Sequence, residues 1–353
     1  MATDTQLTSP TVVRLSDLEH GQEAICFAAL VKKEAGTDRN DKPYVKCHFR
    51  DKRVVIVAPF WSGNAMREEA EAWTEGTAYR LHVRGNHQVR WGMQLDVLAA
   101  RPATEELDEA DGYHFFDLVE TSEQDPDVLF NTVRSLIDKE IDDPYVSRLV
   151  DEILTENAEL FKKMPAARNF HHSYTGGLLE HVWSMTRLAV YLSKHYAKYY
   201  FRLDPPLNRS VVVAASILHD IGKLRELEYH PVEARYTKEG CLIGHVLMGR
   251  DLVRETALRI EGFPRETLLL LEHAILSHHG RRDYGAPVVP QTVEALLVSF
   301  IDDLDAKMNI AARVRLRSTT DEPFTDKVFA MENRRFYKGV PIAAPDLDDP
   351  DHP

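Results

Sequence analysis

Apolar and polar positions alternate in short segments over the first hundred residues of the chain. Such alternation, broken by turn residues, is typical of β-strands. A polar, helix-like stretch at residues 64–76 separates the third segment from the fourth. The five segments are residues 23–33, 43–51, 53–61, 78–86 and 91–100. Five strands with a helix between the third and the fourth form an OB-fold, a barrel that often binds single-stranded nucleic acid. The pattern predicts this barrel over residues 12–103, and a small barrel with another function is the alternative.

From residue 126 to residue 318, apolar residues recur at the spacing of amphipathic helices. The helical segments are residues 127–141, 145–164, 177–196, 209–224, 241–258, 265–279 and 291–314. The expected fold is therefore multidomain, with α and β parts: an N-terminal five-stranded OB-fold β-barrel followed by an all-α helical bundle. Residues 104–125 are acidic and aperiodic, as in a linker, and residues 319–342 form an irregular extension. The acidic residues 343–353 are expected to be disordered.

Composition excludes several classes of protein. Of the 353 residues, 44% are hydrophobic and 28% are charged, which is ordinary for a soluble globular protein. No apolar stretch reaches the roughly 18 residues that a membrane helix needs, and no secretory signal is recognisable. Three scattered cysteines exclude a disulfide framework. We therefore expect a protein of the reducing cytoplasm that has no membrane partner.

The net charge of −13 argues against simple electrostatic binding of nucleic acid. The acidic excess, however, lies mainly in residues 104–163, which hold 18 acidic and 5 basic residues. The predicted barrel and most of the helical domain are near neutral, so a local basic groove is compatible with the sequence. A GxxxxGKS/T phosphate loop and a Gly-rich dinucleotide turn are both missing from the sequence, which argues against a P-loop NTPase or a Rossmann dehydrogenase.

Many of the 16 histidines fall between residues 171 and 279, and several stand in apolar helices together with acids. Burying such groups costs several kcal/mol unless they are paired or bind a metal. A shared metal ion is the simplest common explanation, and imidazole with carboxylate suits first-row divalent ions. The residues concerned lie in or at the ends of five predicted helices: His181, His219, Asp220, His245, His278, His279 and Asp302.

Each of these residues has an ordinary explanation when it is taken alone. His181 would be a satisfied core or surface histidine, and His278-His279 before a glycine would be cations at a helix C-terminus. Asp302 would be a solvated acid. The ordered series of His, His-Asp, His, His-His and Asp on consecutive helices is hard to obtain by chance, so we predict a metal site.

His181, His219-Asp220 and Asp302 match the H…HD…D pattern of the HD-domain metal phosphohydrolases, which the chain resembles here. The added His245 and His278-His279 resemble the branch that binds two or more metals. The surrounding sequence resembles the YhaM-type 3′–5′ exoribonuclease family over nearly the whole chain. The segments that carry this resemblance are residues 36–51, 169–185, 217–226, 244–250, 275–295, 301–309 and 324–339.

The resemblance implies two divalent ions, and it implies water activated between them as the attacking group. Mn²⁺ is the expected ion, and Co²⁺, Fe²⁺, Zn²⁺ and Mg²⁺ are alternatives. Asp302 is preferred over Asp303 because it takes the first position of Asp-x-x-Asp-Ala. The ions would be held by His181, His219, Asp220 and Asp302 on one side and by His245, His278 and His279 on the other, with Asp220 bridging.

The candidate catalytic residues are Asp220 and Lys223. Lys223 follows Asp220 by one helical turn and is placed to pair with a phosphate oxygen, although an exposed lysine is the alternative. Further candidate substrate contacts flank the metal residues: Arg168, His172, Arg281 and Arg282. Arg281 and Arg282 could equally be solvated. In the barrel, the candidates for nucleic-acid binding are Trp61, Trp91, Tyr44 and Arg50, and some aromatic residues must instead belong to its core.

The expected function is therefore a metal-dependent 3′–5′ exoribonuclease that releases nucleoside 5′-monophosphates from single-stranded RNA. Single-stranded DNA is a further candidate substrate. The first alternative keeps the HD chemistry on another substrate, as a nucleotide phosphohydrolase or a cyclic-nucleotide phosphodiesterase. The second is a non-catalytic nucleic-acid-binding protein. The sequence leaves open whether the chain forms a homo-oligomer and what residues 321–342 do.

Overall fold

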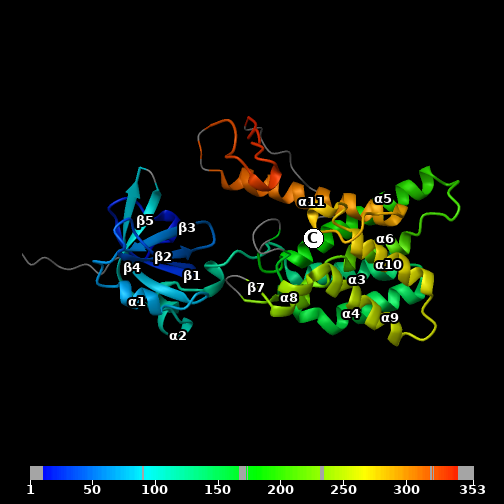
Figure 1. Cartoon of the computed structure of the whole chain (residues 1–353), viewed down its shortest axis with the longest axis horizontal. Helices are drawn as coiled ribbons and strands as arrows, with labels where there is room; N and C mark the ends of the chain where they lie inside the picture. Colours follow the sequence, from blue (N-terminus) through cyan, green and yellow to red (C-terminus); the bar gives the residue numbers. More distant parts are fainter. Residues whose placement is uncertain are drawn as a thin grey trace, which may run out of the picture. The chain divides into compact units, whose positions relative to one another are not determined.

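The structure is a computed structural model that describes residues 11–89, 91–166, 172, 174–230, 234–318, 320 and 322–340. The chain forms two compact units, which are described separately (Figure 1). The first unit extends to Glu120 and also takes in His230, and the second begins at Thr121. The predicted tail, residues 343–353, lies outside the described residues.

The first unit is built on a closed five-stranded barrel with the strand order β1-β2-β3-β5-β4. All neighbouring strands are antiparallel except β3 and β5, which are parallel. The strands are β1 (Glu23–Thr37), β2 (Pro43–Arg50), β3 (Val55–Phe60), β4 (Ala78–Gln88) and β5 (Gly92–Pro102), and helix α1 (Arg67–Ala72) lies between β3 and β4. The predicted barrel with its inserted helix is confirmed.

Alternation of side chains explains the core of the barrel. Along β2, Val45, Cys47 and Phe49 point inward, while the residues between them are partly exposed. Trp73, which follows α1, packs with ring centroids 5.4 Å from both Phe60 and Tyr79. The helix therefore seals the barrel with a cluster of aromatic rings. Burial raises the pKa of the Cys47 thiol to about 12, so this side chain is an unreactive part of the barrel core.

The acidic segment after the barrel is folded onto it as far as Glu120. Helix α2 (Glu105–Asp108) and two 3₁₀ turns form there. Asp108 is fully buried, and Arg101 donates to its carboxylate over 2.8 Å. Tyr113 packs against Phe27 of β1 with ring centroids 5.1 Å apart. The acids of this segment are thus partly used in ion pairs with the barrel.

The second unit is helical, as predicted, with a two-stranded β6–β7 ribbon. Its core element is α6 (Arg209–Leu218), in which every residue after Arg209 is buried. A helix that is buried all round lies inside a bundle, and α6 packs against α3, α4, α5, α10 and α11. The other elements are α3 (Pro126–Glu140), α4 (Pro144–Lys163), α5 (Gly177–Tyr199), α7 (Lys223–Glu226), β6 (Leu227–Glu228), β7 (Arg235–Tyr236), α8 (Lys238–Ile243), α9 (His245–Arg259), α10 (Arg265–Ser277) and α11 (Val293–Arg317).

The helix boundaries follow local sequence signals. Asp125 and Asp143 each precede a proline and accept backbone hydrogen bonds at the start of α3 and α4. Asn208 and Thr292 cap α6 and α11 in the same way. The short loop after α6 is the important one for function, because it carries His219 and Asp220 out of the most buried helix into the centre of the unit.

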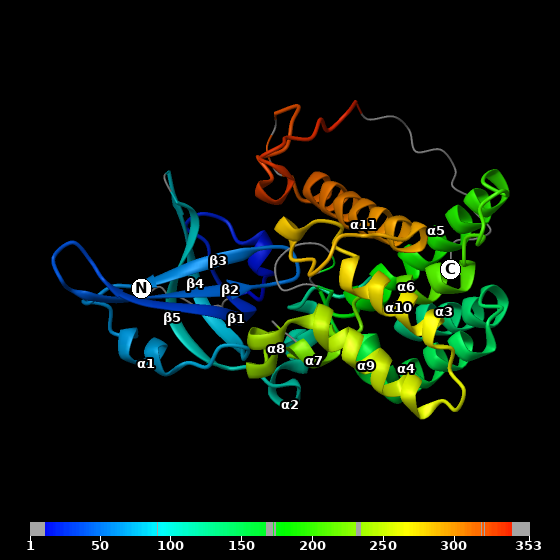
Figure 2. The same ribbon diagram turned by 45° about the vertical axis from the view of Figure 1, so that its right-hand side comes forward.

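Beyond α11, the described C-terminal residues fold back on themselves (Figure 2). Single β-bridges join Phe324 to Tyr337 and Val328 to Arg334, and Arg315 of α11 donates to the carbonyl of Lys338 over 2.7 Å.

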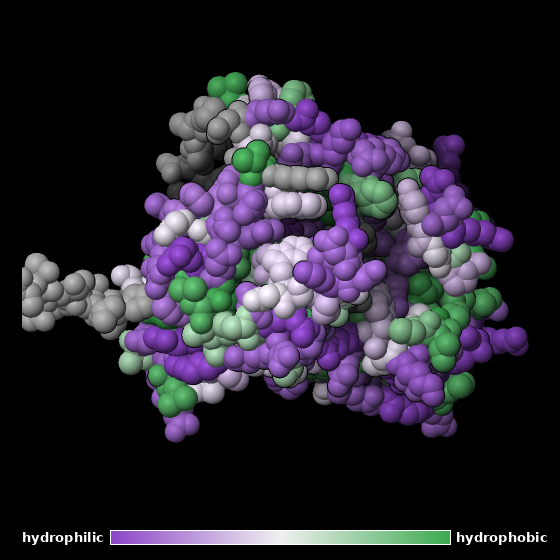
Figure 3. Space-filling view, turned by 60° about the vertical axis from the view of Figure 1, so that its left-hand side comes forward, coloured by the Kyte–Doolittle hydropathy of each residue, from purple (hydrophilic) through white to green (hydrophobic). Residues whose placement is uncertain are grey.

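Among the described residues, no helix combines the length and the hydrophobicity that a membrane span requires. The face drawn in Figure 3 is covered mainly by hydrophilic side chains.

Candidate metal centre

The ends of three helices and the sides of two others meet at one point in the second unit. His219 and Asp220 follow α6, His245 opens α9, and His278 and His279 follow α10. His181 projects from α5 and Asp302 from α11. Four of these side chains are almost fully removed from solvent, with 0–2% of their surface exposed: His181, His219, Asp220 and His278. The structure thus brings together all seven residues that the sequence predicted as metal ligands.

Asp220 lies between the histidines. Its Oδ1 is 3.4 Å from Nε2 of His245 and 3.7 Å from Nε2 of His278. Its other oxygen, Oδ2, is 3.4 Å from Nε2 of His219. On the far side of His219, Oδ1 of Asp302 is 3.3 Å from Nε2 of His181. A single carboxylate therefore faces both halves of the cluster.

In three histidines of the cluster, the ring nitrogen Nδ1 faces an oxygen that can accept a hydrogen bond but cannot donate one. Nδ1 of His219 donates to the carbonyl of Ser216 over 3.0 Å, and Nδ1 of His278 donates to the carbonyl of Ile275 over 2.7 Å. Nδ1 of His245 lies 3.0 Å from Oε1 of Glu226. Because Nδ1 faces an acceptor in each case, Nε2 is the ring nitrogen left to bind a metal ion, and it faces the cluster.

The buried atoms at the centre test whether these residues fit a metal ion. Among the described residues, Nε2 of His219, His245 and His278 and Oδ1 of Asp220 are buried without a hydrogen-bond partner. Leaving such an acceptor unsatisfied costs about 1–3 kcal/mol. Ligands with bonds of about 2.1 Å to one ion lie roughly 3 to 3.5 Å apart, close to the spacings seen here. The donor set therefore fits divalent cations.

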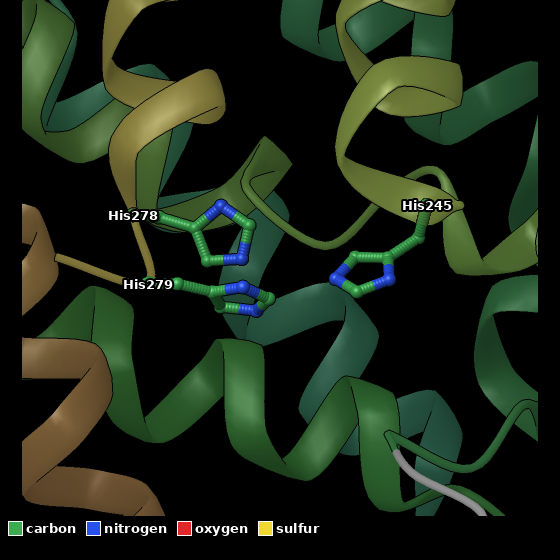
Figure 4. Close-up of side chains that lie close together, drawn as sticks. All are labelled: His245, His278 and His279. Atoms are coloured by element: carbon green, nitrogen blue, oxygen red, sulfur yellow. The ribbon is translucent and has the colours of Figure 1, made fainter. Parts of the chain in front are cut away.

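Figure 4 shows one half of the cluster. His278 and His279 reach in from the end of α10, and His245 reaches in from the start of α9. The ligand atoms of these three residues all lie within 4.8 Å of one another. Burial lowers the pKa of His278 well below its usual value and also lowers that of His279. Both rings are therefore neutral near pH 7, as metal ligands must be.

The acids of the cluster are held in their charged form. Burial alone would raise the pKa of Asp220, but Lys223 and His219 outweigh it and hold that pKa well below its usual range. Asp302 behaves in the same way, mainly through His181. Burial lowers the pKa of His181, but Asp302 and Asp305 together raise it to about 9. Binding a cation at Nε2 of His181 would displace that proton.

Two carboxylates beside the cluster were missed by the sequence analysis. Asp305 of α11 lies 2.7 Å from Nδ1 of His181, and Glu226 of α7 supports His245. For Asp305, a signal was present, because Asp302 and Asp305 are three residues apart and so share a helix face. Glu226 lies on a different helix from the histidine it contacts, and no spacing in the sequence connects the two.

The predicted substrate contacts are distributed differently. Lys223 is 7% exposed and donates to the Asp220 carboxylate. His172 is 3% exposed and faces Asp305 and Tyr174. Arg281 and Arg282 lie on the loop after His279 and are exposed. Arg168 is outside the described residues. Their roles in substrate binding stay predictions.

In the barrel unit, the structure joins two of the four candidate residues. Tyr44 and Trp61 lie with ring centroids 5.3 Å apart, and the ammonium group of Lys46 is 5.2 Å from the Tyr44 ring. Trp61 is 50% exposed. The β-register places Trp91 and Arg50 at the other end of β3, roughly 20 Å along the strand. One aromatic and basic patch therefore consists of Tyr44, Lys46 and Trp61.

A close approach of backbones positions His245. A Cβ on Gly222 would lie 1.9 Å from the carbonyl oxygen of His245 and 2.5 Å from the amide nitrogen of Gly249. We expect Gly222→Ala to lower the melting temperature of the protein by about 5 °C or more, because overpacking costs roughly 1–3 kcal/mol. It should also weaken metal binding by moving His245.

Gly63→Ala is the matched control, since its Cβ would meet no atom within 4 Å. Thermal melting and metal titration check this, and a Gly222→Ala protein that melts and binds metal as the wild type would contradict it.

Comparison with known proteins adds to this geometry. The HD domain family model matches residues 178–307. A second family model, TraI_2, described as a helicase, matches residues 129–225. A solved domain of replication protein A from Methanococcus maripaludis matches 26% of the chain at 12% identity, with a TM-score of 0.22 that is too low to add to the assignment.

Curated relatives match along almost the whole chain. The 3′-5′ exoribonuclease YhaM of Bacillus subtilis is 32% identical over 91% of this chain and 96% of that protein. The protein of the same name from Bacillus pumilus is 33% identical over 90% of this chain and 95% of that protein. The Listeria monocytogenes protein is 33% identical over 93% of this chain and 98% of that protein. With its barrel, its HD domain and this coverage, the chain belongs to the family of the YhaM 3′-5′ exoribonucleases.

Proposed function

We propose that this protein is a metal-dependent exoribonuclease that shortens single-stranded RNA from its 3′ end and releases nucleoside 5′-monophosphates. The observation that carries the proposal is the placement of Asp220. Its two oxygens face the Nε2 atoms of three histidines from three different helices. The names of the curated relatives support RNA as the substrate and the 3′-to-5′ direction.

In this proposal, seven residues would hold two divalent ions, with Asp220 shared between them. They are His181, His219, Asp220, His245, His278, His279 and Asp302. When bound, such ions supply positive charge to the scissile phosphate and acidify the attacking water. Mn²⁺ is our first choice, because a mixture of imidazole and carboxylate ligands suits first-row ions. Lys223 donates to the Asp220 carboxylate and holds it in its charged form. It follows Asp220 by one helical turn, so it would pair with an oxygen of a phosphate bound beside Asp220.

The barrel would hold the RNA upstream of its 3′ end. Tyr44 and Trp61 offer ring faces for bases, and Lys46 offers a cation for the backbone, which is the combination used by proteins that bind single strands.

The three free cysteines, of which Cys26 and Cys47 are buried, support a reducing compartment such as the cytoplasm.

The test is digestion of 5′-labelled and 3′-labelled RNA oligonucleotides with Mn²⁺. We expect a ladder of shortening products from the 5′-labelled strand and immediate release of a labelled mononucleotide from the 3′-labelled strand. Parallel DNA strands show whether DNA is also a substrate. Intact oligonucleotides under every divalent ion would reject the proposal. Hydrolysis of mononucleotides or cyclic nucleotides by the same preparation would then favour the phosphohydrolase alternative.

Trp61→Ala tests the barrel patch. Stacking of a base on an aromatic ring contributes about 1–3 kcal/mol, so we expect the Kd for single-stranded RNA to rise about 5- to 150-fold. Hydrolysis of a small chromogenic phosphodiester should not change, because that substrate has no RNA strand for the barrel to bind. Leu98→Ala, which removes an apolar side chain that is 43% exposed on the same barrel, is the matched control. Equal RNA affinity of the Trp61→Ala and Leu98→Ala proteins would remove Trp61 from the binding surface.

A further inference from the structure

Asp305 forms a buried hydrogen-bond cluster at Nδ1 of His181, whereas Nε2 of the same ring lies near Asp302 of the metal centre. Oδ2 of Asp305 is 2.7 Å from Nδ1 of His181 and 3.2 Å from Nε2 of His172. The hydroxyl of Ser184 donates to Oδ1 of the same carboxylate. Asp305 is 7% exposed. Its carboxylate therefore makes one contact toward the metal centre and two contacts that fix its own position.

The support of His181 differs from that of His219 and His278 and resembles that of His245, whose Nδ1 faces Glu226. His219 and His278 donate to backbone carbonyls, which are neutral acceptors fixed by their helices. His181 instead faces a charged side chain from another helix. A carboxylate behind a ligating histidine fixes the tautomer and orientation of the ring and makes the ligand more basic. The geometry behind His181 is of this kind.

The position of Asp305 is fixed by several groups around it. The backbone amide of His172 donates to Oδ1 of Asn309 over 3.1 Å, and Nδ1 of His172 lies 2.9 Å from the Tyr174 hydroxyl. His172 has φ 45°, in the left-handed region that a side chain occupies only when its surroundings hold it there. Burial raises the pKa of Asp305, but His172 and His181 outweigh it, so the carboxylate stays charged.

We propose that Asp305 is a positioning residue of the metal centre: it turns Nε2 of His181 toward the ion and raises the affinity of that half of the site. This inference rests on the proposed metal centre and is independent of the RNA substrate. Because His172 holds Asp305 in turn, the same cluster gives His172 a part in supporting the metal centre from behind.

The experiment compares Asp305→Asn and Asp305→Ala with the wild type in calorimetric titrations with Mn²⁺ and in visible spectra with Co²⁺. Asparagine has the same shape and keeps one acceptor, so it tests the charge, whereas alanine removes the contact. Loss of such a support weakens metal affinity about 10- to 100-fold, and we expect this for one of two binding steps. Activity should return at high metal concentration. Glu226→Gln is the matched control and should weaken the other step, because Glu226 supports His245.

Melting curves in excess chelator separate this role from a purely structural one. In chelator, Asp305→Asn should melt somewhat below the wild type, because it loses the buried pairing with His181. The difference from the wild type should grow when metal is present. Two binding steps of wild-type affinity in Asp305→Asn would overturn the inference, as would a loss of stability that is equal with and without metal. Weaker metal binding in a protein that degrades no RNA would support the inference while rejecting the proposed exoribonuclease activity.

Discussion

Asp220→Asn is expected to lower kcat for RNA about 10³-fold or more, because the change removes the carboxylate charge shared by both halves of the metal centre. Asp220 is also the partner of the buried Lys223. An ammonium left without its carboxylate is costly, so the melting temperature should fall as well. The measurement is single-turnover digestion of labelled RNA at saturating Mn²⁺, with thermal melting to show that the variant is folded.

Asp303→Asn is the matched control for that substitution. Asp303 stands beside Asp302 in the sequence, but its side chain is 45% exposed and pairs with Lys307 on the outside of α11. We expect the Asp303→Asn protein to keep wild-type kcat. Normal turnover in Asp220→Asn, or equal losses in the two variants, would contradict the role given to Asp220.

Removing divalent ions is expected to stop hydrolysis and to destabilise the helical unit. An ion present at a thousand times its Kd adds about 4 kcal/mol to the stability of the folded state. In a unit of this size, that corresponds to a fall in melting temperature of roughly 10 °C when the ion is removed. The melting temperature should fall, because the Nε2 atoms of His219, His245 and His278 lose the cation that satisfies them.

Scanning calorimetry with and without excess chelator, combined with RNA digestion, measures both effects. His219→Ala provides the control, because a protein that lacks this ligand should show a much smaller metal-dependent shift. Readdition of Mn²⁺ should restore activity and melting temperature together. Full activity in excess chelator would contradict the account.

The sequence predicted the architecture because each element carries its own periodicity. Alternation along β2 and the continuous apolar stretch of α6 require no knowledge of tertiary structure. The seven cluster residues were predictable for a related reason. Each interrupts or ends an apolar helix, where an unpaired polar group is too costly to persist without a common partner.

Apart from Asp305, which shares a helix face with Asp302, the supporting groups were not predictable in this way. Glu226 and His245 meet only because Gly222 lets α7 and α9 approach closely. His172 stood out in the sequence as a substrate contact, yet its ring is buried against Asp305. Trp61 and Trp91 are both exposed aromatic residues, and only the pairing of β3 with β5 shows that they lie at opposite ends of a strand. Such relations between distant segments depend on register and packing.

The most direct test of the central claim is a crystal structure of the protein grown with Mn²⁺, with anomalous diffraction measured at the manganese edge. The account predicts two anomalous peaks in the second unit, both within bonding distance of Asp220. One should contact His181, His219 and Asp302, and the other should contact His245, His278 and His279. Anomalous peaks located elsewhere, or an ordered cluster without any peak in crystals that contain Mn²⁺, would contradict it.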